Sequence, residues 1–236
     1  KSILDSPRII PLQVGKEMVI CDKRHRYMDR CQDDEVCVCE MSQANVEQIS
    51  RIIEIAGSDP AGWRKTTLEE RHKIMYEAAN RLGEMRGDLI GCMCAITGKT
   101  VVEGDVEVSE GIDYARFYTT SMKLFADLPD VDITPEGTVL VISPWNFPCA
   151  IPIGGIVAAL AGGNTVILKP ATVAAPVAWL FAQAFWDAGV PKEALQDGLK
   201  KMGIAEGEVL KKSTLQNLET ELEQQYNQQG RYNADI

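Results

Sequence analysis

Polar side chains close two apolar runs of the sequence. Thr138 to Ile142 leads into Ser143, Pro144, Trp145 and Asn146, and Thr165 to Leu168 stops at Lys169. Two buried strands joined by an apolar segment are typical of a βαβ unit, in which ligands bind beyond the carboxyl ends of the parallel strands. We therefore expect a ligand site where Ser143 and Asn146 meet Lys169.

Cys149 is a candidate nucleophile in the same stretch, because it follows Asn146 by three positions. A position at the start of a helix can lower the pKa of a thiol. Neither His25 nor His72 is near it in sequence, however, and it opens an apolar segment. We expect a packed core thiol rather than a reactive one.

The other cysteines do not predict a metal site. The sequence has seven cysteines, and Cys37-x-Cys39 and Cys92-x-Cys94 lack the two-residue spacing of common zinc sites. Structural thiols without a bound metal are the expectation. An odd number of cysteines and the absence of a signal-like apolar start favour a reducing compartment, the cytoplasm.

The pattern along the chain predicts an α/β fold in four stretches. Residues 1–40 alternate short apolar runs with turns and predict an antiparallel strand region, and residues 41–136 predict helices. Residues 137–196 predict the parallel, Rossmann-type βαβ core, in which a further helix follows Pro170 and ends before Gly189. Residues 197–236 are polar and Gln-rich and predict a helical tail, with a possible capping box at Ser213 and Gln216.

Two helix starts are marked within residues 41–136. Ser42 is the expected N-cap of one helix, and Thr67 with Glu70 forms the capping box of the next. The first helix is expected to bury one apolar face, made of Val46, Ile49, Ile52, Ile53 and Ala56. Further helices are expected over 89–96 and 106–125. Arg71 and Arg81 are expected on solvated faces.

The composition excludes several classes of partner. The chain has 236 residues, 45% of them hydrophobic, a formal net charge of -10 and a pI near 4.8. Such a surface repels nucleic acid and anionic membranes, so a small-molecule protein is expected. The run from Cys149 to Leu168 is about as long as a bilayer is thick, but Pro and Gly interrupt it, and a buried βαβ core explains it without a membrane span.

The stretch from Ser143 to Pro148 (SPWNFP), with Gly163-Asn164-Thr165-Val166 and Lys169-Pro170-Ala171, is similar to the cofactor half of the aldehyde dehydrogenase superfamily. Matches to Trp63, Gly98-Lys99 and Gly189-Val190-Pro191 extend the resemblance over about residues 9–196. Glu107 to Glu110 with Ile112 to Tyr114 most resembles the glutamate-semialdehyde (pyrroline-carboxylate) dehydrogenases, which occur alone or fused behind a proline dehydrogenase. The implied fold is an incomplete, N-terminal part of the aldehyde dehydrogenase fold.

The resemblance implies roles for individual residues. Asn146 would donate its amide to the oxyanion of the thiohemiacetal, although an Asn that caps the turn would look the same. Lys169 would bind the adenosine ribose, unless it is an ordinary surface lysine. The residues expected to line the cleft for NAD or NADP are Ile142, Ser143, Pro144, Trp145, Lys169, Pro170, Ala171 and Thr172. The implied reaction oxidises an aldehyde, glutamate semialdehyde, to the acid.

Two departures from the family pattern qualify the expectation. Thr172 stands where the family often has Glu, and without that carboxylate a 2'-phosphate is no longer repelled, so NADP becomes acceptable. The family's nucleophilic Cys and general-base Glu do not follow Gln196. We therefore expect a truncated enzyme that is inactive alone. The resemblance also implies a homo-oligomer and fusion to, or association with, a proline dehydrogenase. The alternative is a non-catalytic binding or oligomerisation module.

Overall fold

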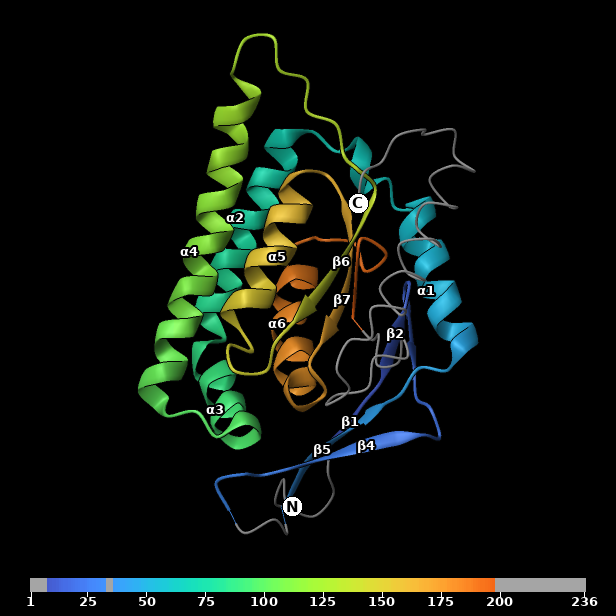
Figure 1. Cartoon of the computed structure of the whole chain (residues 1–236), viewed down its shortest axis with the longest axis vertical. Coiled ribbons are helices and arrows are strands. Elements are labelled where there is room, and N and C mark those ends of the chain that lie inside the picture. The colour runs from blue at the N-terminus through green and yellow to red at the C-terminus, as the bar shows by residue number, and fades with distance from the viewer. Residues whose placement is uncertain (1–7, 33–35, 198–236) are drawn as a thin grey trace, which may run out of the picture. The chain divides into compact units, whose positions relative to one another are not determined.

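A computed structural model describes residues 8–32 and 36–197, and all of them fall in one compact unit (Figure 1). The strands are β1 (Arg8–Ile10), β2 (Leu12–Val14), β3 (Glu17–Val19), β4 (Arg24–Met28), β5 (Cys37–Ser42), β6 (Thr138–Ser143), β7 (Thr165–Pro170) and β8 (Leu195–Asp197). The α-helices are α1 (Val46–Ser58), α2 (Leu68–Glu84), α3 (Arg86–Thr97), α4 (Val101–Ala126), α5 (Ala150–Ala161) and α6 (Ala175–Asp187), with short 3₁₀ turns at Trp63–Lys65 and Thr172–Ala174. The predicted tail from residue 198 onward, with Ser213 and Gln216, lies outside the described residues.

The expected βαβ core is confirmed. Strands β6, β7 and β8 form a parallel sheet in that order, with Val139 opposite Val166 and Leu168 opposite Asp197. Helix α5 connects β6 to β7 and packs on both, while α1 lies on the other side of the sheet (Figure 1). Val166 and Leu168 are fully buried, as expected of a parallel strand covered on both faces.

Large apolar side chains from five α-helices, α2 to α6, and from the parallel sheet make the main core. Its largest fully buried members are Trp63, Met75, Leu82, Leu89, Met93, Ile153, Ile156, Leu160, Leu168, Phe181 and Phe185. Helix α5 is buried on almost all sides, because α2 and α4 cover the side that the sheet does not. The apolar run that resembled a membrane span, Cys149 to Leu168, is therefore the central helix α5 followed by most of strand β7. No helix in the described part of the chain is long and apolar enough to cross a membrane.

The N-terminal strands are antiparallel with one exception. Strand β2 pairs with β3, and β4 pairs with β5, both antiparallel as predicted. Strand β1, however, runs parallel to β5, with Arg8 opposite Cys39. The predicted antiparallel pairing is therefore confirmed for β2 with β3 and for β4 with β5, whereas the parallel pairing of β1 with β5 was not predicted. It arises because β5 lies between β4 and β1 and pairs with both.

The start of α1 also differs from the prediction. Asn45, not Ser42, is the N-cap, and it forms a capping box with Gln48. Ser42 instead ends β5, where its hydroxyl accepts a hydrogen bond from the Cys21 N–H at 3.1 Å. Ile49, Ile52 and Ala56 are buried, but two members of the predicted face are exposed, Val46 by 78% and Ile53 by 39%. The buried face is narrower than predicted.

The other helices largely follow their signals. The Thr67–Glu70 capping box of α2 is confirmed. Helix α4 begins at Val101, five positions before the predicted start, because Thr100 and Glu103 form a further capping box. Arg81 lies on the surface in ion pairs with Glu77 and Glu84, as expected.

The prediction that Arg71 lies on a solvated face was wrong. Arg71 is only 8% exposed, and its Nε donates to the Ala161 carbonyl at 3.0 Å. A second donor of the guanidinium bonds the Thr66 carbonyl. The side chain satisfies a carbonyl at the end of α5 that has no partner within that helix, and burial lowers the pKa of Arg71.

Candidate cofactor and oxyanion site

The carboxyl ends of β6 and β7 bring the predicted residues to one edge of the sheet. Ile142 lies opposite Lys169, and Ser143 lies opposite Pro170. The Ala171 N–H donates to the Ser143 carbonyl at 3.1 Å, so the pairing continues past the last residue of β7. The chain leaving β6 and the chain leaving β7 therefore begin side by side.

The turn after β6 is open to solvent. Pro144, Trp145, Asn146 and Phe147 are all exposed, Trp145 by 55% and Phe147 by 43%. Ile142 is 57% exposed beside them. An exposed apolar group next to an exposed amide suits a ligand that has flat rings and polar substituents.

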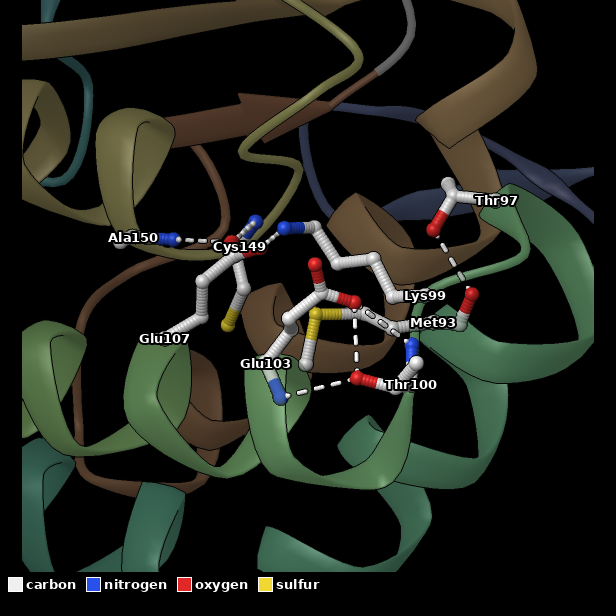
Figure 2. Close-up of polar contacts among 8 residues, drawn as sticks. All are labelled: Met93, Thr97, Lys99, Thr100, Glu103, Glu107, Cys149 and Ala150. Carbon is white, nitrogen blue, oxygen red and sulfur yellow. Dashed lines mark hydrogen bonds and ion pairs between the residues drawn. The ribbon is translucent and has the colours of Figure 1, made fainter.

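Asn146 is not the cap of the following helix. The N-cap residue of α5 is Cys149, and no side chain of its own segment caps it. The backbone N–H groups of Cys149 and Ala150 instead donate to Oε2 of Glu107, at 3.0 and 3.2 Å (Figure 2). Glu107 comes from α4, and the sequence offered no signal for this contact beyond the family-like Glu107-Val108 pair.

Cys149 is a buried thiol, as expected. Its side chain has no exposed surface, and burial, with the nearby Glu107 carboxylate, raises its pKa well above the ordinary value. A neutral, inaccessible thiol is a poor nucleophile. The other thiols, too, are free, and among residues 8–32 and 36–197 no group of three or more His, Cys, Asp or Glu side chains could hold a metal ion.

The loop after β7 carries the remaining predicted residues. Lys169 is half-buried at the strand end, and Ala171 and Thr172 are half-buried in the loop. The Tyr27 hydroxyl donates to the Thr172 carbonyl at 2.8 Å, so a buried residue of β4 fixes this loop. Sequence reasoning did not find Tyr27, because the two residues are 145 positions apart.

The polar groups at the carboxyl ends of β6 and β7 suit a nicotinamide dinucleotide. The Ser143 hydroxyl is 5% exposed, and its oxygen is one of few buried polar side-chain atoms in the described residues without a hydrogen-bond partner. Lys169 offers a cation at the neighbouring strand end. Hydroxyl groups and phosphates of a dinucleotide are suitable partners for such groups.

These features define an α/β protein with a candidate ligand site at the carboxyl ends of a parallel βαβ unit. Residues 21–199 match the aldehyde dehydrogenase family, and the chain belongs to that family. The resemblance seen in the sequence is thereby confirmed.

Several relatives carry a more specific name. A 1-pyrroline-5-carboxylate dehydrogenase of Geobacillus sp. (strain WCH70) is 33% identical over 195 residues, which is 78% of this chain and 38% of the relative. An α-ketoglutaric semialdehyde dehydrogenase of Bacillus subtilis is 34% identical over 161 residues, 64% of this chain and 33% of the relative. The chain therefore spans well under half the length of these relatives.

Solved structures agree on the fold. A 1-pyrroline-5-carboxylate dehydrogenase from Thermus with bound NAD superposes with a TM-score of 0.75 at 28% identity, covering 82% of this chain and 40% of that one. Proline utilization A from Bdellovibrio bacteriovorus gives a TM-score of 0.76 at 25% identity, covering 82% and 21%. The chain thus has the fold of the N-terminal part of aldehyde dehydrogenases.

Proposed function

We propose that this chain is the N-terminal part, with the first half of the cofactor domain, of an enzyme that oxidises glutamate semialdehyde to glutamate with NAD or NADP. The observation that carries the proposal is the shared edge of β6 and β7, where the exposed turn with Asn146 lies beside the strand end with Lys169. Membership of the aldehyde dehydrogenase family supports the reaction class. The Thermus relative with bound NAD supports the choice of cofactor.

The names of the relatives support the substrate class. Addition of water to 1-pyrroline-5-carboxylate opens its ring and gives glutamate semialdehyde, and a second relative is named for α-ketoglutaric semialdehyde. Both aldehydes also carry a carboxylate. We therefore propose an aldehyde with a carboxylate at its far end as the substrate.

Each residue at the edge has a task in this proposal. A nicotinamide dinucleotide, when bound, supplies the hydride acceptor. Lys169 would bind ribose hydroxyls, and the segment Ile142 to Trp145 would line the cleft. Asn146 would donate its amide to the oxygen on which negative charge develops when a thiolate adds to the aldehyde, and a donor already in place for that charge stabilises the transition state.

Cys149 is not the thiolate of this proposal, because it is inaccessible and its pKa is raised. The proposal assigns the nucleophile to a part of the protein other than these 236 residues, so that this polypeptide by itself does not oxidise aldehydes. Proline utilization A among the structural relatives supports a further proposal, fusion to or association with a proline dehydrogenase. A cytoplasmic homo-oligomer remains our prediction.

Substitution of Asn146 tests the proposal in the catalytically complete enzyme. Asn146→Ala should lower kcat for glutamate semialdehyde by about 10² to 10³, with an unchanged Kd for the dinucleotide. Asn80→Ala, on the exposed face of α2, is the control. Reduced dinucleotide formed per unit time gives kcat, and fluorescence titration gives Kd.

An unchanged kcat in Asn146→Ala would reject the oxyanion role. If the unaltered enzyme neither binds a dinucleotide nor oxidises any carboxylated aldehyde, the proposed function itself is wrong. A non-catalytic binding module would then be the better description.

A further inference from the structure

The turn that carries Asn146 ends in a helix that does not cap itself. The first backbone N–H groups of any α-helix have no partner within the helix. At α5 the N-cap is Cys149, whose side chain accepts no hydrogen bond from the helix. The partner comes from α4, because one oxygen of Glu107 accepts from both Cys149 and Ala150 (Figure 2).

Glu107 is buried and paired on its second oxygen. The residue is 1% exposed, and Oε1 lies 2.6 Å from Nζ of Lys99, whose side chain is 14% exposed. A buried carboxylate is costly unless a cation and hydrogen-bond donors compensate it. Here both kinds of partner are present, the ammonium on one oxygen and two amides on the other.

Lys99 also contacts the turn directly. Its Nζ lies 4.7 Å from the centre of the Phe147 ring, a cation–π distance. Phe147 follows Asn146 in the chain. The Lys99–Glu107 pair therefore holds the chain just after Asn146 at two points, the Phe147 ring and the amides of Cys149 and Ala150.

Close packing fixes the position of α4 along α5. Gly111 lies one helical turn after Glu107, and a Cβ atom at Gly111 would come within 2.9 Å of the Ile153 side chain on α5. Such a close approach leaves little room for α4 to slide along α5. The carboxylate is thus placed at the N-terminus of α5 by packing as well as by charge.

We infer that Glu107 and Lys99 are positioning residues for Asn146: the buried pair clamps the turn that presents the amide to the substrate oxygen. The inference rests on the proposed role of Asn146. The clamp leaves dinucleotide binding to the strand ends, so its loss should reduce turnover more than cofactor affinity.

Nuclear magnetic resonance of the 236-residue chain tests the clamp without any catalytic activity. Glu107→Gln keeps the shape of the side chain and removes its charge. We expect it to shift the backbone amide resonances of Cys149 and Ala150, together with the side-chain amide of Asn146 and the indole N–H of Trp145. The indole resonances of Trp63 and Trp179, buried elsewhere, should stay in place.

Glu103→Gln is the matched control. Glu103 lies one turn earlier on α4, and its carboxylate accepts hydrogen bonds from the N–H and the hydroxyl of Thr100 in the capping box of its own helix (Figure 2). It should shift none of the resonances of Trp145, Asn146, Cys149 and Ala150. If Glu107→Gln does not fold because Lys99 is left unpaired, the double variant Lys99→Met with Glu107→Gln removes both charges and is compared instead.

Kinetics of the catalytically complete enzyme supply the second readout. A displaced catalytic group costs up to about 100-fold in rate, and we expect Glu107→Gln to lower kcat by about 10- to 100-fold. The Kd for the dinucleotide should change by a smaller factor than kcat, and Glu103→Gln should retain the kcat of the unaltered enzyme. A purely structural role would lower stability and leave kcat of the folded enzyme unchanged.

The outcomes separate the two proposals. An Asn146 side-chain resonance that stays in place while those of Cys149 and Ala150 move would overturn the clamp, as would an unchanged kcat. A failure of the unaltered enzyme to oxidise aldehydes would instead reject the proposed function, and the resonances would still decide whether Glu107 holds the turn.

Discussion

Lys169 lies at the end of β7, opposite Ile142, and is half-buried there. If it binds the ribose of the cofactor, Lys169→Ala should raise the Kd for NAD about tenfold, since a hydrogen bond to a charged group contributes about 1.5 kcal/mol. Fluorescence titration of the chain measures this Kd. Lys73→Ala, on the exposed face of α2, is the control, and an equal Kd in both variants would reject the contact.

Thr172 offers a test of cofactor choice. Thr172→Glu would place a carboxylate in the loop after β7, where it would repel the 2'-phosphate of NADP by about 1 kcal/mol or more. The ratio of the Kd for NADP to the Kd for NAD should therefore rise about fivefold. Thr172→Gln has nearly the same size without the charge and should leave the ratio unchanged. A ratio that rises equally in both variants would argue against electrostatic selection.

At the scale of elements, Arg71 joins α2 to the end of α5. Its guanidinium donates to the carbonyls of Ala161 and Thr66 and is almost fully buried. Arg71→Met would leave these carbonyls without a partner, which costs about 2 to 3 kcal/mol. Urea denaturation should show a correspondingly lower midpoint.

Arg81→Met is the matched control for this prediction. Arg81 lies on the same helix, but its side chain is 43% exposed, and its ion pairs within the described residues are with Glu77 and Glu84. Its loss should cost less than about 1 kcal/mol. Equal losses in the two variants would show that the buried contacts of Arg71 contribute nothing beyond those of a surface charge.

The elements themselves were predictable where a local signal decides them. The Thr67–Glu70 box starts α2 because both partners lie within one helical turn. At α1 the N-cap prediction was wrong, because Ser42 and Asn45 are both good N-cap residues. Asn45 is the cap because Gln48, three positions later, completes a capping box with it. The parallel pairing of β1 with β5 was not predictable, because strand direction in a short sheet depends on the path of the chain between the strands.

At the scale of the whole unit, buried amide side chains join its first strands to its last. Gln196 is fully buried; its Oε1 accepts from the Gly15 N–H at 2.9 Å, and its Nε2 donates to the Ile52 carbonyl at 3.2 Å. Gln13, in β2, donates to the Leu195 carbonyl at 3.3 Å, 182 positions along the chain. These bonds connect the N-terminal strands and α1 to β8.

Gln196→Leu should therefore destabilise the whole unit. The substitution keeps most of the volume but leaves the Gly15 N–H and the Ile52 carbonyl unsatisfied, at a cost of about 2 to 4 kcal/mol. Gln183→Leu is the control, because Gln183 is half-buried on α6 and its amide donates to the Trp179 carbonyl of the same helix, so its hydrogen bond joins no second element. Thermal unfolding followed by circular dichroism measures both. If Gln196→Leu and Gln183→Leu have the same midpoint temperature of unfolding, the Gln196 hydrogen bonds do not stabilise the unit as proposed.

The sequence by itself determined the βαβ core, the edge that gathers Ser143, Asn146 and Lys169, and the family. It could do so because the spacing of apolar residues, the turn residues and the SPWNFP run are all read from short stretches of sequence. The carboxyl ends of neighbouring parallel strands also lie at a common edge of the sheet. Only the tertiary structure decided that Arg71 is buried, that Tyr27 holds the Thr172 loop, and that Lys99 and Glu107 support the Asn146 turn. Each of these contacts joins elements distant in sequence, and a charged residue on a helix looks like a surface residue until packing shows which carbonyl or amide it faces.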